Sequence, residues 1–120
     1  MAQKIHPDNL RQRTKRFALT IIRLYKSLPK IEEARILGRQ ILRSGTSVGA
    51  QYREASRSRS RAEFISKIES GLQELDETIY WLELLVEAKI SNNDLSPIVN
   101  EATELTAILV TSVKTAKRNK

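Results

Sequence analysis

Apolar residues recur every three or four positions through most of the chain, a spacing that predicts four amphipathic α-helices. The predicted helices cover about residues 8–28, 32–59, 61–89 and 92–117. No segment has the strict apolar–polar alternation of a strand, and the connections are short. The pattern therefore predicts an all-α fold, with residues 1–120 forming one domain built as an up-down-up-down four-helix bundle.

The first and fourth predicted helices have polar caps and an apolar face. The first begins near Asp8 or Asn9 and ends before Pro29. The fourth begins either at Ser91, with Asp94 completing a capping box, or at Ser96, with Pro97 in the first turn; we favour the earlier start. The positions expected to be buried are Leu10, Phe17, Ile21, Leu24 and Leu28 in the first helix, and Leu95, Val99, Ala102, Leu105, Leu109 and Ala116 in the fourth.

The second predicted helix contains three glycines, Gly38, Gly45 and Gly49. Each glycine inside a helix costs about 0.5–1 kcal/mol relative to alanine, so we expect a neighbouring helix to approach closely and compensate. The alternative is a break near Gly45 that divides the segment into two short helices.

The third predicted helix has the most regular pattern. Ser60 and Glu63 form a capping box before it. The apolar residues that follow have a 3-4 spacing typical of coiled-coil packing: Ile65, Ile68, Leu72, Leu75, Ile79, Leu82 and Val86. A second apolar group lies off this seam on the outer face: Tyr80, Trp81, Leu84 and Ala88.

Exposed aromatic side chains on a charged helix are typical of a protein interface, so we expect self-association. We assign the interface to this outer group together with the small-residue face around Gly45 and Gly49. The alternative is a monomer in which the N-terminal arm covers the outer group.

Positive charge is concentrated in the first half of the chain. The formal net charge is +7, and residues 1–61 carry 15 basic and 4 acidic side chains, whereas residues 62–95 carry 2 and 8. Such a balance favours nucleic acid or another acidic partner.

An arginine stripe lies opposite the apolar face of the second predicted helix. At about 100° per residue its members share roughly an 80° sector, provided that the helix continues to Ser60. The stripe consists of Arg35, Arg39, Arg43, Arg53, Arg57 and Arg61, and the opposite face of Ala34, Leu37, Ile41, Val48, Tyr52 and Ala55. Further candidates for phosphate binding are Arg59, in an arginine-serine run, the cluster Arg11, Arg13, Lys15 and Arg16, and a basic tail of Lys114, Lys117, Arg118 and Lys120.

The residues that most enzymes need are scarce. There is no cysteine, and His6 is the single histidine, so thiol catalysis and histidine catalysis in the core are excluded. Glu74 and Glu77 lie one turn apart and could share a metal, but salt-bridged carboxylates are the favoured interpretation. We therefore expect no enzymatic activity, cofactor, metal or small-molecule substrate. The chain has no apolar run long enough for a signal peptide or membrane span, which predicts a cytoplasmic protein.

Two stretches resemble the four-helix-bundle family of 23S rRNA intervening-sequence proteins. The first is RSGTSVGAQYREA at residues 43–55, and the second runs from SRAEFI at 60–65 through ELDET at 74–78 to YWLELL at 80–85. The resemblance implies an unbroken second helix and a ring-like homo-oligomer, a homopentamer. Proteins of this family are similar to accessory variability proteins of diversity-generating retroelements, basic pentameric barrels that bind nucleic acid and a reverse transcriptase. The resemblance implies no catalytic residues.

Our leading hypothesis is a non-enzymatic, oligomeric bundle that binds RNA or DNA through phosphate contacts, with weak sequence selectivity. The alternative is a scaffold or accessory subunit that docks an acidic partner such as a reverse transcriptase. In a third interpretation the charges only pair the third helix of one subunit with the second helix of the next.

Overall fold

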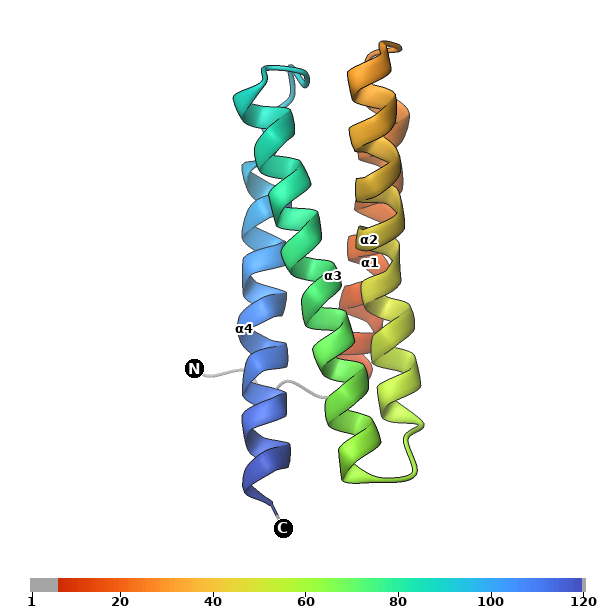
Figure 1. Ribbon diagram of the computed structural model, residues 1–120, viewed down its shortest axis with the longest axis vertical. Coiled ribbons are helices and arrows are strands. Elements are labelled where there is room, and N and C mark those ends of the chain that lie inside the picture. The colour runs from red at the N-terminus through yellow and green to blue at the C-terminus, as the bar shows by residue number, and fades with distance from the viewer. Residues whose placement is uncertain (1–6, 120) are drawn as a thin grey trace.

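The computed structural model describes residues 7–119, which contain four α-helices and no strand. They are α1 (Pro7–Ser27), α2 (Glu32–Ser56), α3 (Arg61–Glu87) and α4 (Ser96–Arg118). The helices lie alongside one another as a four-helix bundle, with α2 packed on α1 and on α3, and α4 packed on α3 and α1 (Figure 1). The α1–α2 and α3–α4 connections lie at one end of the bundle, and the α2–α3 connection lies at the other (Figure 1).

The glycines of α2 bring this helix close to α1; the sequence predicts a close neighbouring helix without identifying it. A β-carbon at Gly45 would lie 2.7 Å from Cγ1 of Ile21, and one at Gly49 would lie 3.2 Å from Oγ1 of Thr14. Helix α2 is unbroken through both positions. The close approach of α1 thus accounts for the glycines, and the predicted alternative of a break near Gly45 is wrong.

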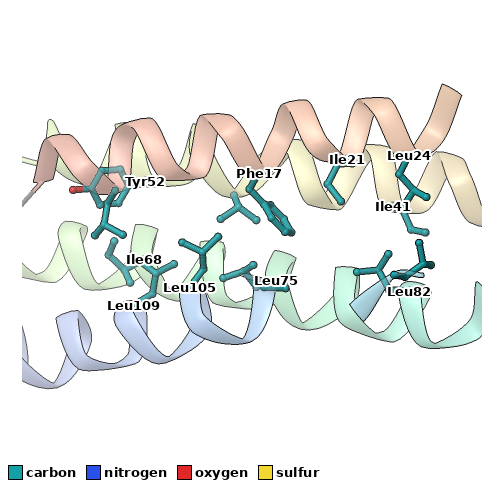
Figure 2. Close-up of a cluster of buried hydrophobic side chains, with 14 of the residues drawn as sticks. Phe17, Ile21, Leu24, Ile41, Tyr52, Ile68, Leu75, Leu82, Leu105 and Leu109 are labelled. Atoms are coloured by element: carbon teal, nitrogen blue, oxygen red, sulfur yellow. The ribbon is translucent and has the colours of Figure 1, made fainter. Parts of the chain in front are cut away.

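The core is a continuous column of apolar side chains from all four helices. Figure 2 shows Tyr52 near one end of the drawn cluster, Phe17 and Leu75 in its middle and Leu82 toward the other end. All the apolar positions predicted for α1 and α2 are buried or half-buried. In α4 the prediction missed Val113, which is buried.

The buried seam of α3 differs from the predicted one. The buried residues of α3 are Ile68, Gly71, Leu75, Thr78, Leu82 and Leu85. The predicted Leu72 and Ile79 are only half-buried, and Val86 is 51% exposed. Polar Thr78 can occupy the core because its hydroxyl lies 2.7 Å from that of Ser44 on α2 and donates to the carbonyl of Glu74. The pattern of apolar residues alone could not identify this pair.

Helix α4 begins at Ser96, so the predicted early start at Ser91 is wrong. Asp94 does not complete a capping box with Ser91. Its carboxylate instead accepts a hydrogen bond from the Ser96 backbone N–H at 3.0 Å. This hydrogen bond lowers the pKa of Asp94. Pro97 stands in the first turn of the helix, where its missing N–H costs nothing.

Helix α3 ends two residues earlier than predicted. Lys89 has a φ of 56°, in the left-handed region. Its backbone N–H donates to the carbonyl of Val86, and the N–H of Ile90 donates to that of Leu85. These two hydrogen bonds form the Schellman motif that terminates helices, here with lysine where glycine is usual.

Candidate nucleic-acid interface

The structure divides the predicted arginine stripe among three segments. Helix α2 ends at Ser56, so its outer face carries only Arg35, Arg39, Arg43 and Arg53. Arg57 is the C-cap residue, Arg59 lies in the α2–α3 connection, and Arg61 is the first residue of α3. The prediction that one helix carries all six arginines is therefore wrong, because it required α2 to continue to Ser60.

Two arginines of α2 are held by acidic side chains of the same chain. Arg35 forms an ion pair with Glu32, one turn earlier on the same helix. Arg43 lies 2.6 Å from Glu77 and 3.4 Å from Glu74, which links α2 to α3. Glu74 and Glu77 thus bind an arginine, and no group of three or more potential metal ligands occurs among residues 7–119.

The other two arginines of α2, Arg39 and Arg53, have no acidic partner among the described residues. Arg57, Arg59 and Arg61 also form no ion pair within this part of the chain, and all three side chains are exposed. Their guanidinium groups therefore remain available to an external anion.

The basic cluster Arg11, Arg13, Lys15 and Arg16 has members on two sides of α1, one facing α4 and the other facing α2. Arg13 faces α4, where it makes two 2.8 Å hydrogen bonds to Glu101 and a third, of 3.2 Å, to Glu104. The hydrogen bonds to Glu101 are the main cause of its raised pKa. Arg16 lies beside it in a groove that Pro97 also lines. Arg13 thus joins α1 to α4, and we remove it from the candidate binding residues.

Arg11 and Lys15 lie on the other side of α1, toward α2. Thr14 faces Gly49 and Ile21 faces Gly45, so the two helices run in opposite directions. Arg11 lies three residues before Thr14, and Arg53 lies four residues after Gly49. Because the helices are antiparallel, both arginines lie at about the same height along the α1–α2 pair. At about 100° per residue, Arg11 and Lys15 follow Thr14 around α1 toward solvent.

The unpaired side chains on the outer surface of α1 and α2 form what we call the basic face. Its members are Arg11, Lys15, Arg39, Arg53 and Arg57. The close glycine contacts between α1 and α2 hold the backbone of this face, so they set the positions from which its side chains extend.

A family model described as 23S rRNA-intervening sequence protein matches residues 9–111. The chain belongs to this family. Among solved structures, it is similar to a protein with unknown function from the S23 ribosomal protein family of Bacteroides thetaiotaomicron VPI-5482, with 39% identity and a TM-score of 0.82. That match covers 90% of this chain and 97% of the other. The comparison with curated proteins finds no match.

For this member of the 23S rRNA-intervening sequence protein family, the structure restricts the predicted oligomer interface. Gly45 and Gly49 are buried against α1 of their own chain, so they are not available to a second copy. Trp81 and Leu84 are half-buried, whereas Tyr80 is 53% exposed and Ala88 is exposed. The N-terminal arm that we considered as a cover lies outside the described residues, as does His6.

No helix in the described part of this family member is long and apolar enough to cross a membrane.

Proposed function

We propose that the chain binds RNA or DNA through phosphate contacts of the basic face, with weak sequence selectivity. The observation that carries the proposal is the placement of Arg11, Lys15, Arg39 and Arg53 on one surface of the α1–α2 pair without acidic partners. Guanidinium groups hold phosphates bidentately, and no described aromatic side chain belongs to this face. The contacts would thus be to the backbone of the nucleic acid and carry little sequence information.

The test is the salt dependence of binding to labelled duplex DNA and structured RNA, followed by fluorescence anisotropy. Each phosphate contact contributes about 0.9 to the slope of log K against log salt concentration for duplex DNA. A variant with Arg39, Arg53 and Arg57 changed to glutamine should therefore lose as much as about 2.7 from this slope.

A matched control changes Arg16, Lys89 and Lys114 to glutamine. These side chains are exposed and without ion pairs in the described residues, but lie away from the basic face: Arg16 is on the α4 side of α1, Lys89 follows α3 and Lys114 is on α4. The control removes the same net charge from other surfaces. Because these charges would not contact the bound phosphates, the slope of log K against log salt concentration should change much less. Equal losses of slope in the two variants would show that net charge, and not the basic face, determines binding. Absence of binding by the unmodified chain would refute the proposal.

We also propose that the chain acts as a non-catalytic cytoplasmic protein, an up-down-up-down bundle assembled into a ring-like homo-oligomer, with a pentamer in keeping with the family resemblance. Exposed Tyr80 and Val86 on α3 support a contact with another copy.

Light scattering coupled to size-exclusion chromatography tests the assembly. Tyr80→Lys should dissociate it, whereas Gln12→Lys, at an exposed position of α1, should not. A monomer at micromolar concentration for the unmodified chain would contradict self-association.

A further inference from the structure

An open pocket lies at the end of the bundle that carries the α2–α3 connection. Its volume is about 730 Å³, within the usual range of roughly 300–1,000 Å³ for small-ligand sites. All four helices contribute apolar lining: Leu10 of α1, Tyr52 of α2, Phe64 of α3 and Ile108 of α4. This pocket could not be predicted from the sequence, because its lining comes from residues between Leu10 and Ser112.

Hydroxyl groups also line the pocket, and most of them present acceptors. Ser56, Ser58, Thr111 and Ser112 each donate a hydrogen bond to a backbone carbonyl three or four residues earlier in the chain. Because a hydroxyl has one proton, the free lone pairs of these four oxygens are what a ligand would meet. Ser60 differs from these four: its oxygen accepts from the Glu63 N–H, which leaves its proton to donate.

Arginines stand between the pocket serines in the sequence of the connection. Ser56, Ser58 and Ser60 line the pocket, while Arg57, Arg59 and Arg61 alternate with them and are exposed. The pocket is therefore apolar inside, rich in hydrogen-bond acceptors at its wall, and bordered by three cations that no described acidic group neutralises. The C-terminal end of α4, with exposed Lys114 and Arg118, lies at the same end of the bundle (Figure 1).

We propose that this pocket takes one unpaired nucleotide of a bound RNA. The base would enter against Phe64 and Ile108, and the flanking phosphates would meet the arginines of the connection. A pocket wall of acceptors favours a base edge rich in N–H donors, which guanine supplies best and uracil supplies least. The inference rests on the proposed nucleic-acid binding and adds to it a preference for single-stranded ends or bulges.

The test compares three labelled hairpin RNAs that share one stem: a blunt hairpin, one with a single 3′ guanosine overhang and one with a single 3′ uridine overhang. A base that stacks on an aromatic side chain gains roughly 5- to 150-fold in affinity. We expect a gain of this size for the guanosine overhang over the blunt hairpin, and a smaller gain for uridine.

A pocket-filling variant, Thr111→Trp, should abolish the gain and leave affinity for the blunt hairpin unchanged. Thr103→Trp is the matched control, because both threonines are exposed residues of α4 whose hydroxyls donate to the carbonyl four residues earlier. Thr103 does not line the pocket. Circular dichroism of both variants checks that the fold is retained.

A 6-thioguanosine overhang identifies the occupant directly. After irradiation, a crosslink to a peptide containing Phe64 or Ile108 supports the proposal. Crosslinks confined to other peptides overturn it, as does equal affinity for blunt and overhanging hairpins. In the latter case steep salt dependence would leave the proposed function intact, whereas absence of binding to every hairpin would overturn both.

Discussion

Replacing Gly45 with alanine adds one methyl group at the point where α2 meets α1. The new carbon would lie 2.7 Å from Cγ1 of Ile21 and 3.0 Å from its Cγ2. Ile21 is completely buried, and these atoms sit next to its branch point, so the side chain cannot simply rotate away. The substitution therefore forces either the two helices apart or Ile21 into a strained rotamer.

Gly71→Ala on α3 provides the reference for the magnitude. Its new β-carbon would meet Cβ of Gln51 at 3.7 Å and Cδ1 of Leu109 at 3.8 Å, which are ordinary contacts. Both substitutions gain about 0.5–1 kcal/mol from the better helix propensity of alanine. Only Gly45→Ala pays for overpacking, about 1–3 kcal/mol. The propensity gain cancels in the comparison, so the two variants should differ by about 1–3 kcal/mol, with Gly71→Ala more stable than the unmodified chain.

Urea denaturation followed by circular dichroism, at one fixed protein concentration, measures this difference. For a chain of this size it corresponds to a separation of midpoints of roughly 1 M. A second change, Ile21→Ala, removes the clashing atoms, so Gly45→Ala should be less harmful, or even stabilising, in that background. Equal stability of Gly45→Ala and Gly71→Ala would contradict overpacking at Ile21.

Three further predictions concern single contacts. The Thr78 hydroxyl donates to the carbonyl of Glu74, so in the contact between the two hydroxyls Ser44 is the donor. Thr78→Val removes the acceptor of this buried Ser44 hydroxyl and should lower the free energy of unfolding by about 1–3 kcal/mol in urea denaturation. Adding Ser44→Ala should recover part of the loss. Lys89→Gly should stabilise by about 1 kcal/mol in the same assay, because its left-handed backbone is strained for lysine; no gain would contradict this. Asp94 has a pKa below its unfolded value, so its contribution to stability is complete above the usual aspartate range and is lost as the pH falls through the folded pKa. In urea denaturation at a series of pH values, Asp94→Ala should therefore flatten the stability profile at and below the usual titration range of aspartate.

The four helices were predictable because each has a strong apolar period, although the ends of α2 and α3 and the start of α4 were misplaced. Glycine spacing also predicted the close approach of a neighbour, although not that the neighbour is α1. The errors in the buried seam of α3 occurred where either of two neighbouring residues could face the core. At each turn of α3 the apolar residue was expected inside, yet Gly71 and Thr78 take the place of Leu72 and Ile79. Space and a hydroxyl partner on α2 decide these positions, and both depend on the folded neighbour.

The candidate site was less predictable than the fold. Angular position on a helix identifies a residue that points outward, but it does not show which acid on another helix can reach it. Arg43 and Arg13 were equal to the other candidates in sequence, and only the packing of α3 and α4 assigns glutamates to them. Conversely, the sequence could not show that Arg11 and Arg53 lie on the same surface, because this depends on the alignment of α1 with α2 that the glycine contacts establish.

The separation of charge across the bundle affects how the molecule would approach a polyanion. Acidic side chains on α3, including Asp76, Glu83 and Glu87, are exposed and without ion pairs in the described chain, whereas the basic face belongs to α1 and α2. The principal extents of the molecule are 50 × 32 × 20 Å, and all exceed the Debye length of about 8 Å at physiological salt. A nucleic acid near the basic face would therefore be largely shielded from the acidic side. The local charge, and not the net +7, would set its attraction, and the molecule would rotate during diffusion until α1 and α2 face the polymer.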